Sequence, residues 1–300
     1  MKKWMKSLVV TTLLVGLLVT ESSVYASTPA VSNQVFINGM MKDSVITVQG
    51  RTLVQLRALD DPEWLTYTYD AKSRTVSARS KDNSRVVQLK AGEKVATVDG
   101  KKMTLDATIV IKDGHTYVPL RFISESLNAY VTYNVADKRV IIRTPAGQKE
   151  YKKLMSGDLT EARTLAIRLS RVYAKDALTP QGEGFTTDYT FPEGQAMRFM
   201  VDYKSLTNYV EINEDGLAEV KWQRDTFNYP QIIEKGTKPD ILGSQVFFTD
   251  SVMNDLLIFG KIDASGKGME LGRIDRLQQS QYKNVLIVPI EGEVRTDEEK

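Results

Sequence analysis

Short runs of alternating apolar and polar residues occupy the chain from residue 34 to residue 143. Most of these runs end at a glycine or an aspartate-glycine pair, where glycine tolerates the positive φ of a hairpin turn. A period of two is the pattern of strands that bury one face. The pattern predicts an antiparallel sheet with strands at 35–38, 44–48, 65–69, 75–78, 85–89, 94–98, 116–118, 129–133 and 139–143.

The period changes once in each half of this region. Leu120, Ile123 and Leu127 fall at helical spacing, so the sequence predicts a short helix after the strand at 116–118. In the first half the corresponding helix begins at Leu56, and the sequence Asp-Asp-Pro-Glu at residues 60–63 cuts it short.

These two halves are copies of one unit. Residues 50–57 (GRTLVQLR) recur 64 positions later as residues 114–121 (GHTYVPLR), and the offset holds for the strands that follow. A fixed period of this size indicates one supersecondary unit that is used twice. The matched positions are mostly apolar or turn-forming, so the repeat predicts a doubled scaffold and contains neither an acid–base pair nor a set of metal ligands.

Four repeated residues are expected to have structural roles. Gly50 and Gly114 mark the predicted turns, and Arg57 and Arg121 fall in the first turn of each predicted helix. A cation there opposes the helix dipole. We expect an offsetting carboxylate or a set of carbonyl oxygens from neighbouring strands, because the guanidinium offers five donors. The alternative is that both arginines face solvent and bind an external anion.

A second domain is predicted after a break at residues 144–148, with the boundary between 145 and 157. Asp158 begins a capping-box pattern, and apolar residues at helical spacing follow to about Lys175. Strand patterns resume after Pro180, including one at 285–289. Residues 158–290 therefore predict a helix against an antiparallel meander, and the fold class of the whole chain is α+β. Residues 291–300 are charged and predict a disordered tail.

The N-terminus has the order of a secretory signal peptide. Lys2, Lys3 and Lys6 precede an uncharged run, and Val-Tyr-Ala at residues 24–26 predicts cleavage after Ala26. An uncleaved anchor helix is the alternative. Residues 1–26 hold three lysines and one glutamate, so the mature chain has 40 − 3 = 37 basic and 38 − 1 = 37 acidic residues. This balance gives no reason to expect nucleic acid as a partner. We expect a secreted protein, extracellular or envelope-associated, without a membrane span after signal removal.

Candidate chemistry is sparse. The chain has no cysteine and one histidine, His115, which cannot build a multi-histidine metal site and is interpreted as a polar turn or edge residue. Asp250 with Asp255, and Glu211 with Glu214, are carboxylate pairs that glycoside hydrolysis could use, although solvated strand faces also explain them. No catalytic, cofactor-binding or metal-binding residue is therefore predicted.

Tyrosines and tryptophans on the predicted strands have two interpretations. They could stack on sugars or peptide as an extracellular binding module does, or they could pack the sheet core and pair across strands. The candidates are Trp64, Tyr67, Tyr69, Tyr130, Tyr133, Tyr189, Tyr203, Tyr209 and Trp222.

Residues 114–129 (GHTYVPLRFISESLNA), followed by VTYN at 131–134 and KRVII at 138–142, resemble the copper amine oxidase N-terminal-like domain, also called the stalk domain. The resemblance covers residues 34–143, and the predicted domain spans 34–144. It implies an antiparallel sheet wrapped on a helix and an accessory module of secreted and envelope proteins of Gram-positive bacteria. The oxidase chemistry needs three copper-binding histidines, which this chain lacks. The first copy departs from the motif, since Gln55 replaces its proline.

These features predict a secreted, non-enzymatic protein of the cell envelope or its surroundings, with the stalk-like domain as a spacer or interaction module. The expected partner is a cell-wall polymer or another envelope protein, and no cofactor is expected. Two alternatives stay open: a wall-active hydrolase with carboxylates in the C-terminal domain, and a carrier of small ligands or lipids. Two close carboxylates in a cleft would favour the hydrolase, and a deep apolar cavity would favour the carrier.

Overall fold

The computed structural model describes residues 34–42, 45–59, 64–81, 84–134, 136–240 and 243–298. The predicted signal peptide and its cleavage after Ala26 lie outside these residues. Within them, no helix has both the length and the apolar character that a bilayer crossing requires.

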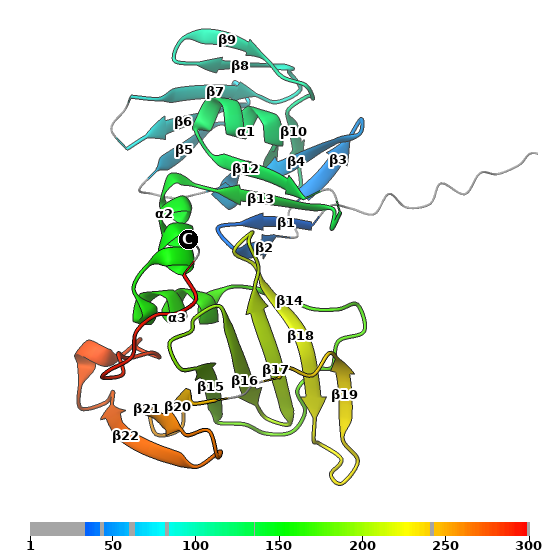
Figure 1. The fold of residues 1–300 in the computed structure, drawn as a ribbon. Helices are drawn as coiled ribbons and strands as arrows, with labels where there is room; N and C mark the ends of the chain where they lie inside the picture. The colour runs from blue at the N-terminus through cyan, green and yellow to red at the C-terminus, as the bar shows by residue number, and fades with distance from the viewer. Residues whose placement is uncertain are drawn as a thin grey trace, which may run out of the picture. The chain divides into compact units, whose positions relative to one another are not determined.

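The first part of the chain forms three small sheets (Figure 1). One has the order β12-β13-β1-β2, from Tyr130–Asn134, Arg139–Arg143, Gln34–Ile37 and Met40–Lys42. The next has the order β10-β11-β4-β3, from Val110–Lys112, His115–Pro119, Arg51–Gln55 and Val45–Val48. The last has the order β5 to β9, from Leu65–Asp70, Thr75–Ser80, Val86–Lys90, Val95–Val98 and Lys101–Thr104. The predicted strands are confirmed, but they form three sheets and not one.

One strand pair breaks the antiparallel pattern. β1 runs parallel to β13, with Val35 opposite Val140 and Ile37 opposite Ile142. This pairing joins residues about a hundred positions apart. The local period of each strand carries no information on such a partner, so the sequence pattern could not predict it.

The repeat is visible in the structure as two equivalent hairpins that meet at their centre. β4 pairs antiparallel with β11, and Val54 lies opposite Val118, its own equivalent in the other copy. The helix α1, Leu120–Leu127, is confirmed, and its counterpart is the short 3₁₀ helix η1, Leu56–Leu59. Leu56, Leu59 and Ile123 are all buried in one apolar core.

The described residues from 145 onward form two α-helices, the short 3₁₀ helix η2, Ser280–Tyr282, and one large mixed sheet. The α-helices are α2, Pro145–Ser156, and α3, Leu159–Arg168. The sheet has the order β14-β18-β17-β16-β15-β20-β21-β22, with β19 paired to β18. These strands are Arg171–Val172, Ala218–Asp225, Leu206–Ile212, Arg198–Tyr203, Thr186–Pro192, Gln245–Ser251, Leu256–Ile262, Gly268–Asp275 and, for β19, Ile233–Gly236.

Three predictions for this part were wrong in detail. The helix from residue 159 ends at Arg168 and not near Lys175, because Arg171 and Val172 pair with β18, in the one parallel pair of the described sheet. The meander is therefore a mixed sheet. Residues 285–289 form no strand, although Ile287 and Val288 are buried in the core beside the sheet.

The segment predicted as a domain boundary is the helix α2. Thr144 caps it by accepting a hydrogen bond from the Gly147 amide (3.1 Å). Arg139 on β13 bonds Glu219 on β18, with side chains 13% and 16% exposed. The contact connects the two parts, and their independent folding stays a prediction.

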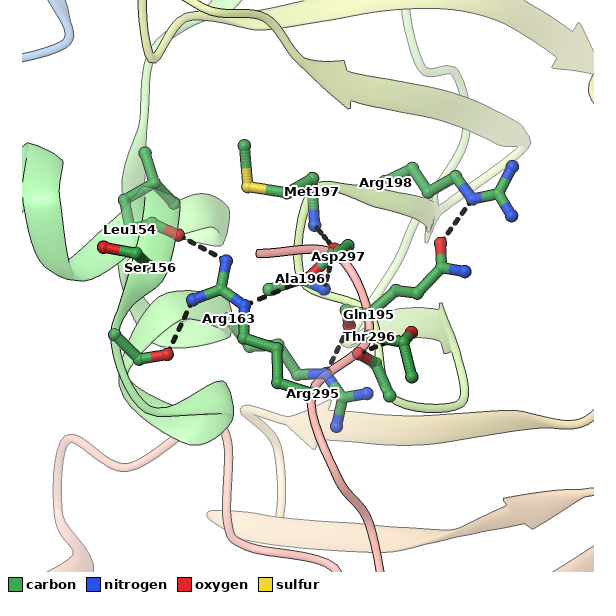
Figure 2. Close-up of polar contacts among 12 residues, drawn as sticks. Leu154, Ser156, Arg163, Gln195, Ala196, Met197, Arg198, Arg295, Thr296 and Asp297 are labelled. Carbon is green, nitrogen blue, oxygen red and sulfur yellow. Dashed lines mark hydrogen bonds and ion pairs between the residues drawn. The ribbon is translucent and has the colours of Figure 1, made fainter. Parts of the chain in front are cut away.

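The predicted disordered tail differs most from the structure. Glu293 makes two hydrogen bonds to the Arg163 guanidinium, at 2.7 and 2.8 Å, and the two side chains are 3% and 2% exposed. Asp297 accepts the amides of Ala196 and Met197, both at 2.7 Å (Figure 2). The charges that suggested a solvated tail are thus paired with buried donors.

Arg295 completes this attachment of the C-terminal segment. Its guanidinium donates to the carbonyls of Leu154 (2.6 Å) and Gly157 (2.7 Å) at the end of α2, and its side chain is 4% exposed. Residues 293–297 therefore hold the end of α2, the side chain of Arg163 on α3 and the turn between β15 and β16 together. Figure 2 shows the part of this attachment that Arg295 and Asp297 make. We call residues 293–297 the C-terminal clamp.

Candidate functional site: a groove beside strand β5

A groove of about 580 Å³ lies in the first part of the chain, between η1, strand β5 and the β10–β11 hairpin. This volume is within the range of small-ligand sites. β5 pairs with β6 on one side and ends the five-stranded order of the described sheet. The groove therefore runs along a sheet edge. Its lining residues are Leu56, Arg57, Thr66, Tyr67, Thr68, Tyr69, Val76, Ile111, Gly114, His115 and Thr116. We call it the β5 groove.

Three apolar or aromatic residues of the β5 groove belong to the core or pack against it. Leu56 and Val76 are 3% and 7% exposed, and Tyr67 is partly buried against the same core. Tyr69, two residues further along β5, is 55% exposed. The core interpretation of the strand tyrosines thus fits Tyr67, whereas Tyr69 presents its ring to solvent beside the groove.

The polar residues of the β5 groove are hydrogen-bond donors and hydroxyls. Arg57 comes from η1, and His115 begins β11 just after the hairpin turn; both are exposed. Thr66 and Thr68 donate to carbonyls of β6, each at 3.4 Å. Among the lining residues that the structure describes, none is a carboxylate, so this set suits a ligand that is neutral or anionic.

The internal repeat gives three residues of the groove an equivalent in the sequence of the other copy. Arg121 corresponds to Arg57, Tyr133 to Tyr69 and Arg51 to His115. Arg121 donates from Nε to Glu125 Oε1 at 2.7 Å, with side chains 71% and 50% exposed. The charge of the second-copy arginine is thus compensated on its own helix.

This pair bears on the expectation for Arg121. Glu125 is a carboxylate, as predicted, and it is exposed and belongs to the same helix as Arg121. The hydrogen bond that Arg121 donates to Glu125, and the negative charge of Glu125, raise the pKa of the Arg121 guanidinium. Solvent screens such an exposed pair, so this contact alone adds little stability, and the structural role of Arg121 stays a prediction. Arg57 is likewise exposed, at the β5 groove.

Gly50 and Gly114 occupy equivalent turn positions, with φ of 73° and 75°. A Cβ at either position would meet no atom within 4 Å. Glycine is therefore favoured by the left-handed backbone alone. At Gly114 this turn carries His115 to the rim of the groove.

The carboxylate pairs considered in the sequence serve as structural partners. Asp250 and Asp255 both bond Arg276, whose side chain is 4% exposed; the Asp255 contact is 2.9 Å. Glu211 accepts the Tyr209 hydroxyl at 2.7 Å. Burial is the larger cause, and together with this hydrogen bond it raises the pKa of Tyr209 to about 12. Glu214 accepts the Tyr151 hydroxyl through its backbone carbonyl.

Sequence reasoning missed another carboxylate pair. Asp188 and Asp202 lie directly opposite each other on β15 and β16, and each accepts a threonine hydroxyl, from Thr249 and Thr207. Burial raises the pKa of the Asp202 carboxyl above its ordinary value, and the charge of Asp188 adds to this rise. The two carboxylates thus have structural partners in the sheet, and neither lines the β5 groove.

A second hollow, of about 340 Å³, lies at the edge of the large sheet. Tyr173 and Tyr203 on its wall are 43% and 36% exposed. It is a surface hollow and not the enclosed apolar cavity that a carrier predicts.

Comparison with known proteins identifies the first part of the chain. Residues 30–142 match the family model described as "Copper amine oxidase N-terminal domain". The chain therefore contains a copper amine oxidase N-terminal-like domain, of a kind typical of surface and envelope proteins. The β5 groove lies within it. No curated protein and no solved structure matched the chain. The C-terminal part is unassigned.

Proposed function

We propose that this is a secreted, non-enzymatic protein of the cell envelope, and that its copper amine oxidase N-terminal-like domain is an interaction module. The observation that supports the proposal most is the β5 groove. It combines an exposed tyrosine ring, an exposed guanidinium and several hydroxyls over an apolar floor, and the lining residues that the structure describes include no carboxylate.

This combination favours a carbohydrate polymer that carries carboxylate or phosphate groups. The face of Tyr69 can stack on a sugar ring through its apolar atoms. The guanidinium of Arg57 can bind a carboxylate or phosphate with two parallel hydrogen bonds. His115 adds a further donor at the rim. A cell-wall polymer of this chemistry is the partner we propose.

Co-sedimentation of the mature chain with purified wall fractions tests the proposal. We expect the wild-type chain to be retained and Arg57→Ala to bind about tenfold more weakly or worse, because a hydrogen bond to a charged group contributes about 1.5–3 kcal/mol. Arg121→Ala is the matched control in the other repeat, and it should bind as the wild type does.

Three outcomes would contradict the proposal. One is no retention on any wall fraction, and another is an equal loss in Arg57→Ala and Arg121→Ala. The third is loss of binding only after protease treatment of the wall, which would identify an envelope protein as the partner. Release of soluble sugar fragments from the wall during the incubation would instead support the hydrolase.

A further inference from the structure

The large sheet ends in an exposed strand, β22, which is coloured orange in Figure 1. In the described part of the chain β22 pairs with β21 and with no strand on its other side. Its eight residues are exposed or half-buried, and its exposed large apolar residues are Met269, at 57%, and Leu271, at 44%. An edge of this kind is a template for pairing with another strand.

A bulge in β22 changes which side chains share a face. Phe259 lies opposite Gly272 and Gly260 lies opposite Glu270, so Leu271 is the extra residue. Because of this insertion, Glu270 and Arg273 come to the same face. They make two hydrogen bonds to each other, Nε to Oε1 at 2.9 Å and Nη2 to Oε2 at 3.0 Å.

We propose that β22 pairs antiparallel with β22 of a second copy of this chain, about a two-fold axis between Leu271 and Gly272. In this register Glu270 of each copy lies opposite Arg273 of the other. Met269 of each copy lies opposite Ile274, which packs against the core of the large sheet. The strand is therefore complementary to itself in charge and in apolar contact.

The register depends on the bulge. Residues opposite each other across an antiparallel pair lie on the same face of the sheet. In a regular strand Glu270 and Arg273 would lie on opposite faces and could not meet in this way. A slip by one residue places Glu270 opposite Gly272 or Ile274, which loses both ion pairs. The proposed register is thus the one in which the two charges meet.

The association is expected to depend on concentration. A single pair of eight-residue strands is smaller than the standard interface of about 1,200–2,000 Å². Opposite charges directly across an antiparallel pair are favourable, and like charges there are unfavourable. The two ion pairs therefore determine whether the copies associate, and reversing one charge affects both pairs.

Sedimentation velocity of the mature full-length chain over a concentration series tests the proposal. The wild-type chain should form dimers, and Glu270→Arg alone and Arg273→Glu alone should each associate at least about tenfold more weakly, since 1.4 kcal/mol corresponds to tenfold. In an equimolar mixture of the two variants every opposed pair again has opposite charges, so association should return. Glu93→Arg is the control, because it reverses one charge of another exposed i,i+3 ion pair, with Lys90.

Unchanged thermal melts would show that the variants are folded, as expected for side chains 41% and 60% exposed. A wild-type chain that remains monomeric at all concentrations would overturn the proposal. So would a dimer that neither reversal weakens, or a mixture of the two variants that stays monomeric.

Discussion

Replacing Glu293 by glutamine tests the C-terminal clamp. The substitution keeps the shape of the side chain but removes the charge that faces Arg163. In the folded protein the side chain of Arg163 is 2% exposed, and its guanidinium lies 5.0 Å from the ring centre of Phe191. Its remaining bonds go to neutral carbonyls, at Gln195 (2.8 Å) and Pro192 (3.4 Å).

The expected cost follows from this burial. Removing one partner of a buried ion pair leaves an uncompensated charge and typically costs about 3–5 kcal/mol. Domains have about 5–15 kcal/mol of total stability, so Glu293→Gln should unfold at a much lower urea concentration. Trp222, on β18 of the large sheet, is 4% exposed, and its fluorescence can report unfolding.

Two further variants isolate the cause. Glu93→Gln removes one charge of an exposed pair (56% and 47% exposed), and it should cost less than about 1 kcal/mol. The double variant Arg163→Met with Glu293→Met removes both buried charges and should be more stable than Glu293→Gln alone. If Glu293→Gln unfolds within about 1 kcal/mol of the wild type, the clamp is not the buried ion pair that the structure indicates.

Other consequences can be checked separately. The pKa of Asp202 is higher in the folded chain than its ordinary value of 3.8, so the wild-type chain loses stability as the pH rises from 3.8 through the raised pKa. Asp202→Asn should therefore be more stable than the wild type at neutral pH. A stability difference that persists well below pH 3.8 would contradict this assignment. Gly114→Ala should cost about 1 kcal/mol, because φ is 75° there, and an unchanged melting temperature would show that the turn relaxes. One histidine and no cysteine should give no tight copper binding, and stoichiometric copper after dialysis would show that other ligands exist. The intact mass of the exported protein should correspond to a chain that begins at Ser27, after cleavage at Ala26. A membrane-held species that keeps residues 1–26 would support the anchor helix.

Local patterns in the sequence predicted the strands of the first domain well. The period-two runs and the turn glycines are patterns of neighbouring residues, and the 64-residue offset is a comparison of two sequence segments. All three can therefore be recognised without knowledge of the fold. The assembly into three sheets depends on pairings such as β1 with β13, whose partners are far apart in the chain. No local pattern specifies such a pairing.

The groove and the clamp show the same limit. Arg57, His115 and Tyr69 were each noted in the sequence for separate reasons, and only the approach of the β10–β11 hairpin to β5 brings them together. The charged residues after 290 are typical of a disordered tail. Glu293 is nevertheless buried, because it pairs with Arg163, which lies 130 positions earlier in the chain. A run of charged residues does not reveal such a distant partner.

A comparison of Tyr69→Ala with Tyr133→Ala shows whether the β5 groove binds the wall polymer. The two tyrosines occupy equivalent positions in the repeat and are 55% and 50% exposed, so both substitutions remove a similar exposed ring from the same domain. Binding of each variant to purified wall polymer can be measured against the wild-type chain. We expect Tyr69→Ala to bind about two- to tenfold more weakly, since stacking of aromatic rings is worth about 0.5–1.5 kcal/mol beyond the area it buries and 1.4 kcal/mol corresponds to tenfold, and we expect Tyr133→Ala to bind normally. Equal binding by the two variants, or a loss confined to Tyr133→Ala, would contradict this expectation.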